Sequence, residues 1–113
     1  MPGHDWIEEF PVAITVCDAQ GTILEMNAAS AEVFRADGGK ELLGASVFDC
    51  HPPRARELLQ AMMADQRTNV YTIEKNGRKK LIYQAPWYQD GQYAGFVELS
   101  LVIPFDAPHF VRG

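Results

Sequence analysis

The stretch of sequence that decides the fold is residues 76–103, which read NGRKKLIYQAPWYQDGQYAGFVELSLVI. It contains Asn-Gly at positions 76–77 and Asp-Gly at positions 90–91. Both pairs are typical of two-residue β-hairpin turns, because these residue types tolerate positive φ angles. The segments around them are rich in aliphatic, β-branched and aromatic residues. The pattern predicts three consecutive antiparallel strands, at residues 68–75, 79–88 and 92–103.

Alternation along these strands sorts their side chains onto two faces of a sheet. The more apolar face is predicted to be the inner wall, and its members are Tyr71, Ile73, Leu81, Tyr83, Ala85, Trp87, Val97, Leu99 and Leu101. Phe96 and Val102 fall on the other face together with Glu98 and Ser100. We therefore expect a mixed outer face that accepts the N-terminal segment or a second subunit.

The first quarter of the chain predicts a second hairpin followed by a helix. Residues 12–18 alternate in the manner of a strand, and residues 22–26 form the returning strand. The side chain of Asn27 is suited to cap a short helix at residues 28–34, because its oxygen accepts a backbone N–H of the first turn. Glycines 38 and 39 end this helix, and a further helical turn is expected at residues 41–43.

A longer helix is predicted to run from the Pro-Pro step at residues 52–53 to about Gln66, since proline is favoured in the first turn of a helix. Its apolar stripe has helical spacing and is expected to cover one face of the sheet. The stripe consists of Ala55, Leu58, Leu59, Met62 and Gln66, with Met63 beside it.

Length and composition indicate one α+β domain over residues 1–113. The chain has 113 residues, of which 47% are hydrophobic, which is enough for a single core. Within it we expect an N-terminal amphipathic segment at residues 1–10, a core at residues 11–103 and an irregular tail at residues 104–113.

Charge and hydropathy exclude several classes of partner. The net charge of −5 disfavours nucleic acid, which requires positive charge to displace counterions. No segment approaches the ~20 apolar residues of a membrane span, so no membrane partner is expected. Two cysteines provide no disulfide framework, and this predicts a cytoplasmic location.

Several motifs together resemble those of PAS domains, from Phe10 to Ile103. The motif residues are Asp18, Gly21, Ile23, Asn27 and Ala29, the segment 40–44 with Phe48 and Asp49, Gly77, Arg78 and Tyr83, and the segment 90–98. The step His51-Pro52-Pro53 resembles that of one PAS subgroup. The resemblance implies a five-stranded antiparallel sheet with short helices and one longer helix on one face.

The resemblance further implies a non-enzymatic sensory and signalling domain of a bacterial-type regulatory module. It is expected to form a homodimer, to contact a signalling partner protein and to bind a small apolar or aromatic ligand between helices and sheet. The expected pocket is lined by Leu58, Met62, Tyr71, Tyr83, Trp87 and Leu99, and the alternative is a filled core. The expected dimer interface contains Trp6, Ile7, Phe10 and Phe96.

Two alternative functions centre on His51. In the first, the imidazole of His51 is an axial ligand of haem in a redox or gas sensor, whereas the main expectation is that no cofactor is bound. In the second, Asp49, Cys50 and His51 perform acid and base chemistry in a small α+β enzyme. The cysteine and histidine spacing lacks a recurring ligand pair, so no metal site is expected.

Overall fold

The computed structural model describes residues 5–113, apart from the side chain of Cys50. The helices are α1 (Asp5–Glu8), α2 (Ala28–Val33) and α3 (Pro53–Asp65), with 3-10 helices at Arg35–Asp37, Gly39–Leu42 and Val47–Cys50. The strands are β1 (Ala13–Asp18), β2 (Ile23–Met26), β3 (Asn69–Lys75), β4 (Arg78–Gln89) and β5 (Gln92–Ile103). The elements expected from the sequence are all present, with bounds that differ by one or two residues.

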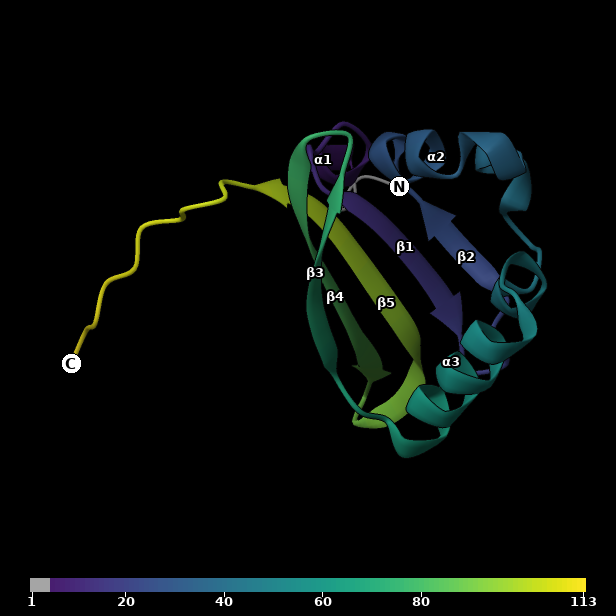
Figure 1. The fold of residues 1–113 in the computed structure, drawn as a ribbon. Helices are drawn as coiled ribbons and strands as arrows, with labels where there is room; N and C mark the ends of the chain where they lie inside the picture. Colours follow the sequence, from purple (N-terminus) through teal and green to yellow (C-terminus); the bar gives the residue numbers. More distant parts are fainter. Residues whose placement is uncertain (1–4) are drawn as a thin grey trace.

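The strands form one antiparallel sheet in the order β2-β1-β5-β4-β3, with α2 and α3 on the same side of it (Figure 1). Both predicted tight turns are confirmed. Asn76 and Gly77 have φ angles of 55° and 75°, and Asp90 and Gly91 have φ angles of 52° and 78°. Two successive positive φ angles are the requirement of the type I′ turn, whose twist matches that of the flanking strands.

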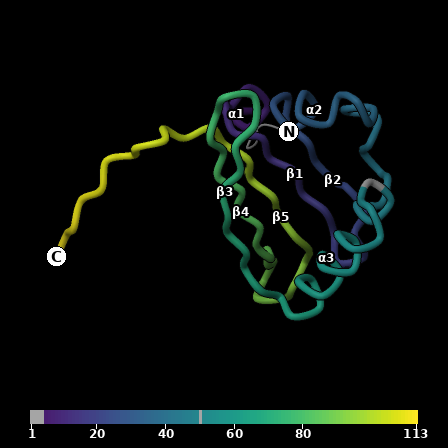
Figure 2. Tube along the Cα trace, viewed as in Figure 1, coloured from purple at the N-terminus to yellow at the C-terminus, as the bar shows by residue number. Residues whose placement is uncertain are grey.

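The expected irregular tail follows β5 and leaves the body of the domain as an extended segment (Figure 2). It has no helix or strand over residues 104–113. Phe105, Phe110 and Val111 are exposed on it. The tail therefore adds nothing to the core, which lies between the sheet and the helices.

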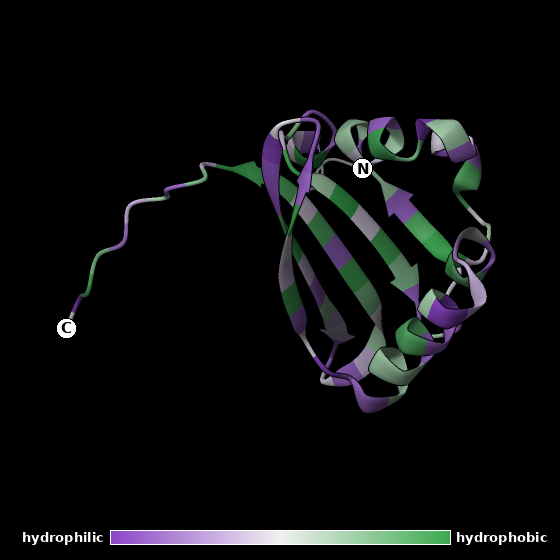
Figure 3. Ribbon diagram, viewed as in Figure 1, coloured by the Kyte–Doolittle hydropathy of each residue, from purple (hydrophilic) through white to green (hydrophobic). Residues whose placement is uncertain are grey.

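The prediction of the inner wall is wrong in two respects. Tyr83, Leu99 and their alternating neighbours do share one face, but it is the face opposite the helices, since the helix-covered core contains Cys17 and Phe96. Tyr71 does not share that face, because the two-residue turn pairs Lys75 with Arg78 and so places Tyr71 beside Ile82. Figure 3 shows hydrophobic and hydrophilic residues alternating along the strands. Alternation defines two faces without saying which one is covered.

The position of Phe96 corrects a further prediction. It was expected at a dimer interface, but only 4% of its surface is exposed, and it packs with Cys17, Met62 and Met63 in the core. The stripe of α3 also differs from the expected one, because Leu58 is 56% exposed. The expected members Met62 and Met63 do face the sheet, with the partly buried Leu59 beside them.

A bulge sets the direction of the side chains in β5. Tyr88 pairs with Tyr93 and Trp87 pairs with Gly95, so Ala94 is the extra residue on β5. Gly95 has a φ angle of 151°, and a Cβ atom at this position would collide with the carbonyl oxygen of Cys17. Only glycine fits this close approach of two strands.

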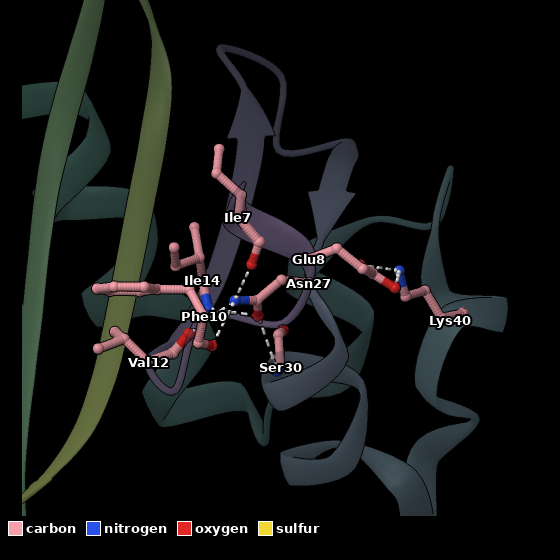
Figure 4. Close-up of polar contacts among 8 residues, drawn as sticks. All are labelled: Ile7, Glu8, Phe10, Val12, Ile14, Asn27, Ser30 and Lys40. Carbon is pink, nitrogen blue, oxygen red and sulfur yellow. Dashed lines mark hydrogen bonds and ion pairs between the residues drawn. The ribbon is translucent and has the colours of Figure 1, made fainter. Parts of the chain in front are cut away.

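Asn27 connects the N-terminal segment to the sheet and to α2 (Figure 4). Its Oδ1 accepts hydrogen bonds from the backbone N–H groups of Ile14, at 2.9 Å, and Ser30, at 3.0 Å. Its Nδ2 lies 3.0 Å from the carbonyl oxygen of Ile7 and 2.7 Å from that of Val12, and donates to both. The predicted helix cap is confirmed, and the same buried side chain also satisfies carbonyl groups of the preceding 20 residues.

An ion pair between Glu8 and Lys40 connects α1 to the 3-10 helix Gly39–Leu42. The Nζ atom of Lys40 lies 2.9 Å from Oε1 of Glu8 and 3.1 Å from Oε2 (Figure 4). The expected helical turn before Pro11 is thus present, although the first four residues of the predicted amphipathic segment lie outside the described part of the chain. Trp6 and Phe10 remain exposed and form an edge-to-face pair with ring centroids 5.5 Å apart.

We predict that Asn27→Ala lowers the free energy of unfolding by about 3 kcal/mol or more, because each buried polar group left without a partner costs roughly 1–3 kcal/mol. Urea unfolding followed by circular dichroism measures the change. Asn69→Ala is the matched control, because Asn69 is only half-buried and its side chain makes one hydrogen bond, to Gln84. Equal losses in the two variants would contradict the assigned role of Asn27.

Candidate functional site

A cavity of about 60 Å³ lies between the sheet and the helical segments. The sheet contributes Thr15, Cys17, Gln84, Phe96 and Glu98, and the facing segments contribute mostly apolar side chains. The remaining lining residues are Ile23 and Met26 of strand β2 and, from the facing segments, Phe34, Leu42, Val47, His51 and Leu59. A mostly apolar cavity with a few polar groups is the usual form of a small-molecule site.

The polar groups of the cavity belong to a row that crosses four strands of the sheet. We call Thr15, Glu98, Gln84 and Asn69 the polar row, because each is paired in register with the next. Asn69 Nδ2 donates to Gln84 Oε1 at 3.1 Å, and Gln84 Nε2 donates to Glu98 Oε1 at 2.7 Å. These hydrogen bonds offset the cost of placing polar groups on the covered face.

The hydroxyl groups of Thr15 and Ser30 extend the polar row to α2. Thr15 Oγ1 and Ser30 Oγ are hydrogen-bonded to each other, and Ser30 is completely buried. Because a hydroxyl both donates and accepts, this pair retains acceptor capacity toward the cavity. The polar row was not predicted from the sequence, because Glu98 was assigned to the face of the sheet that the helices leave uncovered.

Cys17 lies at the apolar end of the cavity. Burial is the main reason why the pKa of its thiol lies above the ordinary value of 9.0, and the charge of Asp18 acts in the same direction. Its carbonyl oxygen accepts a hydrogen bond from Trp87 Nε1 at 3.0 Å. A neutral, buried thiol of this kind is a poor nucleophile and acts here as a packing group.

The structure does not bring the expected pocket residues together. Met62 is buried in the core, Leu58 is exposed on α3, and Tyr71 lies on the helix side of the sheet. Tyr83, Trp87 and Leu99 lie on the opposite face. The predicted set of pocket residues is therefore wrong, because residues from both faces were assigned to one cavity. Burial, and then the charge of Glu98, raise the pKa of Tyr71 above its ordinary value of 10.0.

His51 lies at the edge of the cavity and is exposed. Its Nδ1 is 2.7 Å from the carbonyl oxygen of Val47 and therefore carries the proton of that hydrogen bond. The cavity has space for about four to six water molecules, which is far less than a haem requires. The residues present thus do not fit haem, and the structure gives that hypothesis no support.

The three residues of the enzyme hypothesis occupy the end of the 3-10 helix Val47–Cys50 and the residue after it. Asp49 is exposed, as is His51, and the side chain of Cys50 lies outside the described part of the structure. In the described part of the chain, no three His, Cys, Asp or Glu side chains are grouped to hold a metal ion. Nor does any helix of residues 5–113 have the length and apolar character to span a membrane.

The face of the sheet away from the helices has an apolar centre, with Glu25 of β2 and the pair Glu74 and Lys79 of the β3–β4 hairpin at its edges. We call it the outer face, and its paired rows are Val70, Tyr83, Leu99 and Ile14; Ala85, Val97 and Val16; and Leu81 and Leu101. Val70 is 49% exposed and Tyr83 is 40% exposed. Ile7 of α1 lines a shallow groove with Ile14 and Val16, so α1 borders this surface. Of the four residues expected at the dimer interface, Ile7 lies at this border, and Trp6 and Phe10 are exposed in the same N-terminal segment.

The sheet order, the helices over one face and the cavity between them define an α+β domain of PAS type. The sequence matches the family described as PAS fold over residues 7–103, and the chain belongs to this family. No curated protein matches the sequence at a significant level.

Solved structures share the fold at low sequence identity. A C-terminal domain from Streptococcus mutans has a TM-score of 0.67 and 18% identity, covering 85% of this chain and 78% of its own. The PAS domain of BvgS from Bordetella pertussis has a TM-score of 0.64 and 20% identity, with coverages of 89% and 83%. The PAS domain of the histidine kinase ThkA has a TM-score of 0.62 and 16% identity, with coverages of 79% and 96%.

We predict that the folded state loses stability at alkaline pH through Cys17. Its pKa is raised on folding, so its contribution is complete below the unfolded pKa and falls as the pH rises through the folded pKa. Urea unfolding at about pH 8 and about pH 10, on either side of the ordinary thiol pKa, measures this loss. Cys17→Ala should show a smaller loss between the two pH values. The same loss in both proteins would refute the assignment.

Proposed function

We propose that the chain is a sensory domain that associates with a second copy through the outer face and holds a small ligand in the cavity. The observation that carries the proposal is the distribution of residues on the sheet. Along the polar row the covered face contains the carboxylate of Glu98 and the amides of Gln84 and Asn69, whereas the paired rows at the centre of the opposite face contain aliphatic and aromatic residues. An apolar surface of this kind is typical of an interaction site.

A second copy is the partner that best fits the outer face. The three rows that define the outer face contain no charged side chain, and Glu25 of β2 and the pair Glu74 and Lys79 lie at its edges, so the centre of the face can be buried without desolvating an ion. A flat apolar surface is also self-complementary under twofold symmetry, which is the commonest arrangement of homodimers. Trp6 and Phe10 are exposed in the N-terminal segment whose Ile7 borders the outer face. Both are residue types enriched in interfaces.

The solved structures supply the signalling context of the proposal. One is the PAS domain of a histidine kinase, and another is the sensor region of a sensor histidine kinase that covers 80% of this chain. By analogy, we propose that this domain is non-enzymatic, acts in the cytoplasm and transmits its state to a signalling partner protein. Its assignment to the subgroup with the step His51-Pro52-Pro53 belongs to the same proposal, and the position of Pro53 as the first residue of α3 supports it.

We predict that Tyr83→Glu weakens self-association at least about tenfold, because a carboxylate at the centre of the outer face must be desolvated in the dimer. Sedimentation velocity over a range of concentrations measures the dissociation constant. Circular dichroism verifies that the variant remains folded. Tyr83 is exposed, so we expect the fold to tolerate the substitution.

The matched control is Leu58→Glu, which places the same charge on an exposed residue of α3, on the other side of the sheet. It should associate as the unmodified chain does. A dimer that tolerates Tyr83→Glu but dissociates in Leu58→Glu would place the interface on the helices. A chain that stays monomeric at high concentration would remove the association half of the proposal.

A further inference from the structure

We propose that the cavity takes a small organic cation, an ammonium group on a short apolar body, with Glu98 as its counter-ion. The inference rests on the proposed function, since it uses the same cavity. It assigns the chemical class of the ligand from the polar row and the lining residues.

Among the described residues that line the cavity, Glu98 is the only acidic one, and none is a lysine or arginine. Its carboxylate is half-buried. One oxygen accepts the hydrogen bond from Gln84, and in the described part of the chain the other has no protein donor. No ion pair of residues 5–113 includes Glu98. A carboxylate removed from water in this way is stabilised by a cation placed beside it.

The polar row presents this carboxylate in a fixed orientation. The amide of Gln84 is held between Asn69 and Glu98, so its NH₂ group points at the carboxylate and its oxygen points away. Thr15, the register partner of Glu98 on β1, adds the hydroxyl pair with Ser30. An ammonium group has three N–H donors, and these carboxylate and hydroxyl oxygens are the acceptors that it needs.

The rest of the cavity fits a compact apolar body. Ile23, Leu42, Val47 and Leu59 supply aliphatic walls, and the rings of Phe34 and Phe96 can face a cation. The volume of about 60 Å³ limits the ligand to about four to six non-hydrogen atoms. An anion would meet the charge of Glu98, and among the described lining residues only His51, exposed at the edge of the cavity, is a basic side chain.

Three probes of equal shape and different charge test the inference: isobutylammonium, isobutanol and isobutyrate. Each is titrated into the full chain at neutral pH, and backbone amide shifts of Gln84, Phe96 and Glu98 are followed by NMR. We expect saturable shifts with isobutylammonium and an affinity at least about tenfold above that for isobutanol, because charge-assisted hydrogen bonds are the stronger ones. Isobutyrate should leave these amides unchanged.

Glu98→Gln keeps the shape of the side chain and removes its charge. It should reduce the affinity for isobutylammonium about tenfold or more and leave that for isobutanol unchanged. Glu74→Gln, at an exposed position of β3, is the matched control and should change neither. The amide spectrum of each variant reports whether it is folded.

The outcomes separate the two proposals. If isobutanol or isobutyrate binds in the cavity as tightly as isobutylammonium, the cation class is wrong and the ligand half of the proposed function stands. If Glu98→Gln binds isobutylammonium unchanged, Glu98 is not the counter-ion. If none of the probes gives a saturable shift at the cavity, both the cation class and the ligand half are overturned, and self-association is judged by sedimentation alone.

Discussion

The register between β4 and β5 is the constraint on which the rest of the structure depends. The two-residue turn at Asp90 and Gly91 starts the pairing, and the bulge at Ala94 then shifts it by one residue. As a result Gln84 lies opposite Glu98, and both side chains point to the helices. Because side chains alternate along a strand, a slip of one residue would reverse every side chain of β5. The close approach of Gly95 to Cys17 locks the bulge in place.

This register determines which side chains lie on each face of the sheet. Polar residues lie on the covered face, where hydrogen bonds within the polar row satisfy them. Apolar residues lie on the outer face, which the described part of the chain leaves largely open. The first arrangement creates a cavity with a fixed carboxylate, and the second creates a surface that gains free energy when it is covered. Both the cavity and the outer face are therefore built from the same three strands, β1, β4 and β5.

The sequence predicted the elements of this fold well, for identifiable physical reasons. Asn-Gly and Asp-Gly turns have few alternatives, and Asn27 stands where a helix needs a cap. Its second role, satisfying carbonyl groups of Ile7 and Val12, had no local signal because these partners are 15 and 20 residues away. The order of elements also sufficed to indicate the PAS fold family.

The candidate site was harder to predict, because strand alternation does not say which face is covered. Hydrophobicity favoured the face of Leu99, whereas the helices cover the face of Phe96. Glu98, considered alone, was assigned to the uncovered face, and Gln84 carried no signal of its own. Their pairing across strands makes burial tolerable, and that pairing depends on the bulge at Ala94. A search for polar residues in register across the hairpin is the signal that would have found them.

The most direct test of the account is an isotope-filtered NOE experiment on a mixture of ¹³C-labelled and unlabelled chain. It detects contacts between copies and identifies the methyl groups that make them. The account predicts intermolecular NOEs at the methyl groups of Val97, Leu99 and Leu101, on the outer face. Intermolecular NOEs confined to α3, or none at these methyl groups in a sample that is associated, would contradict it.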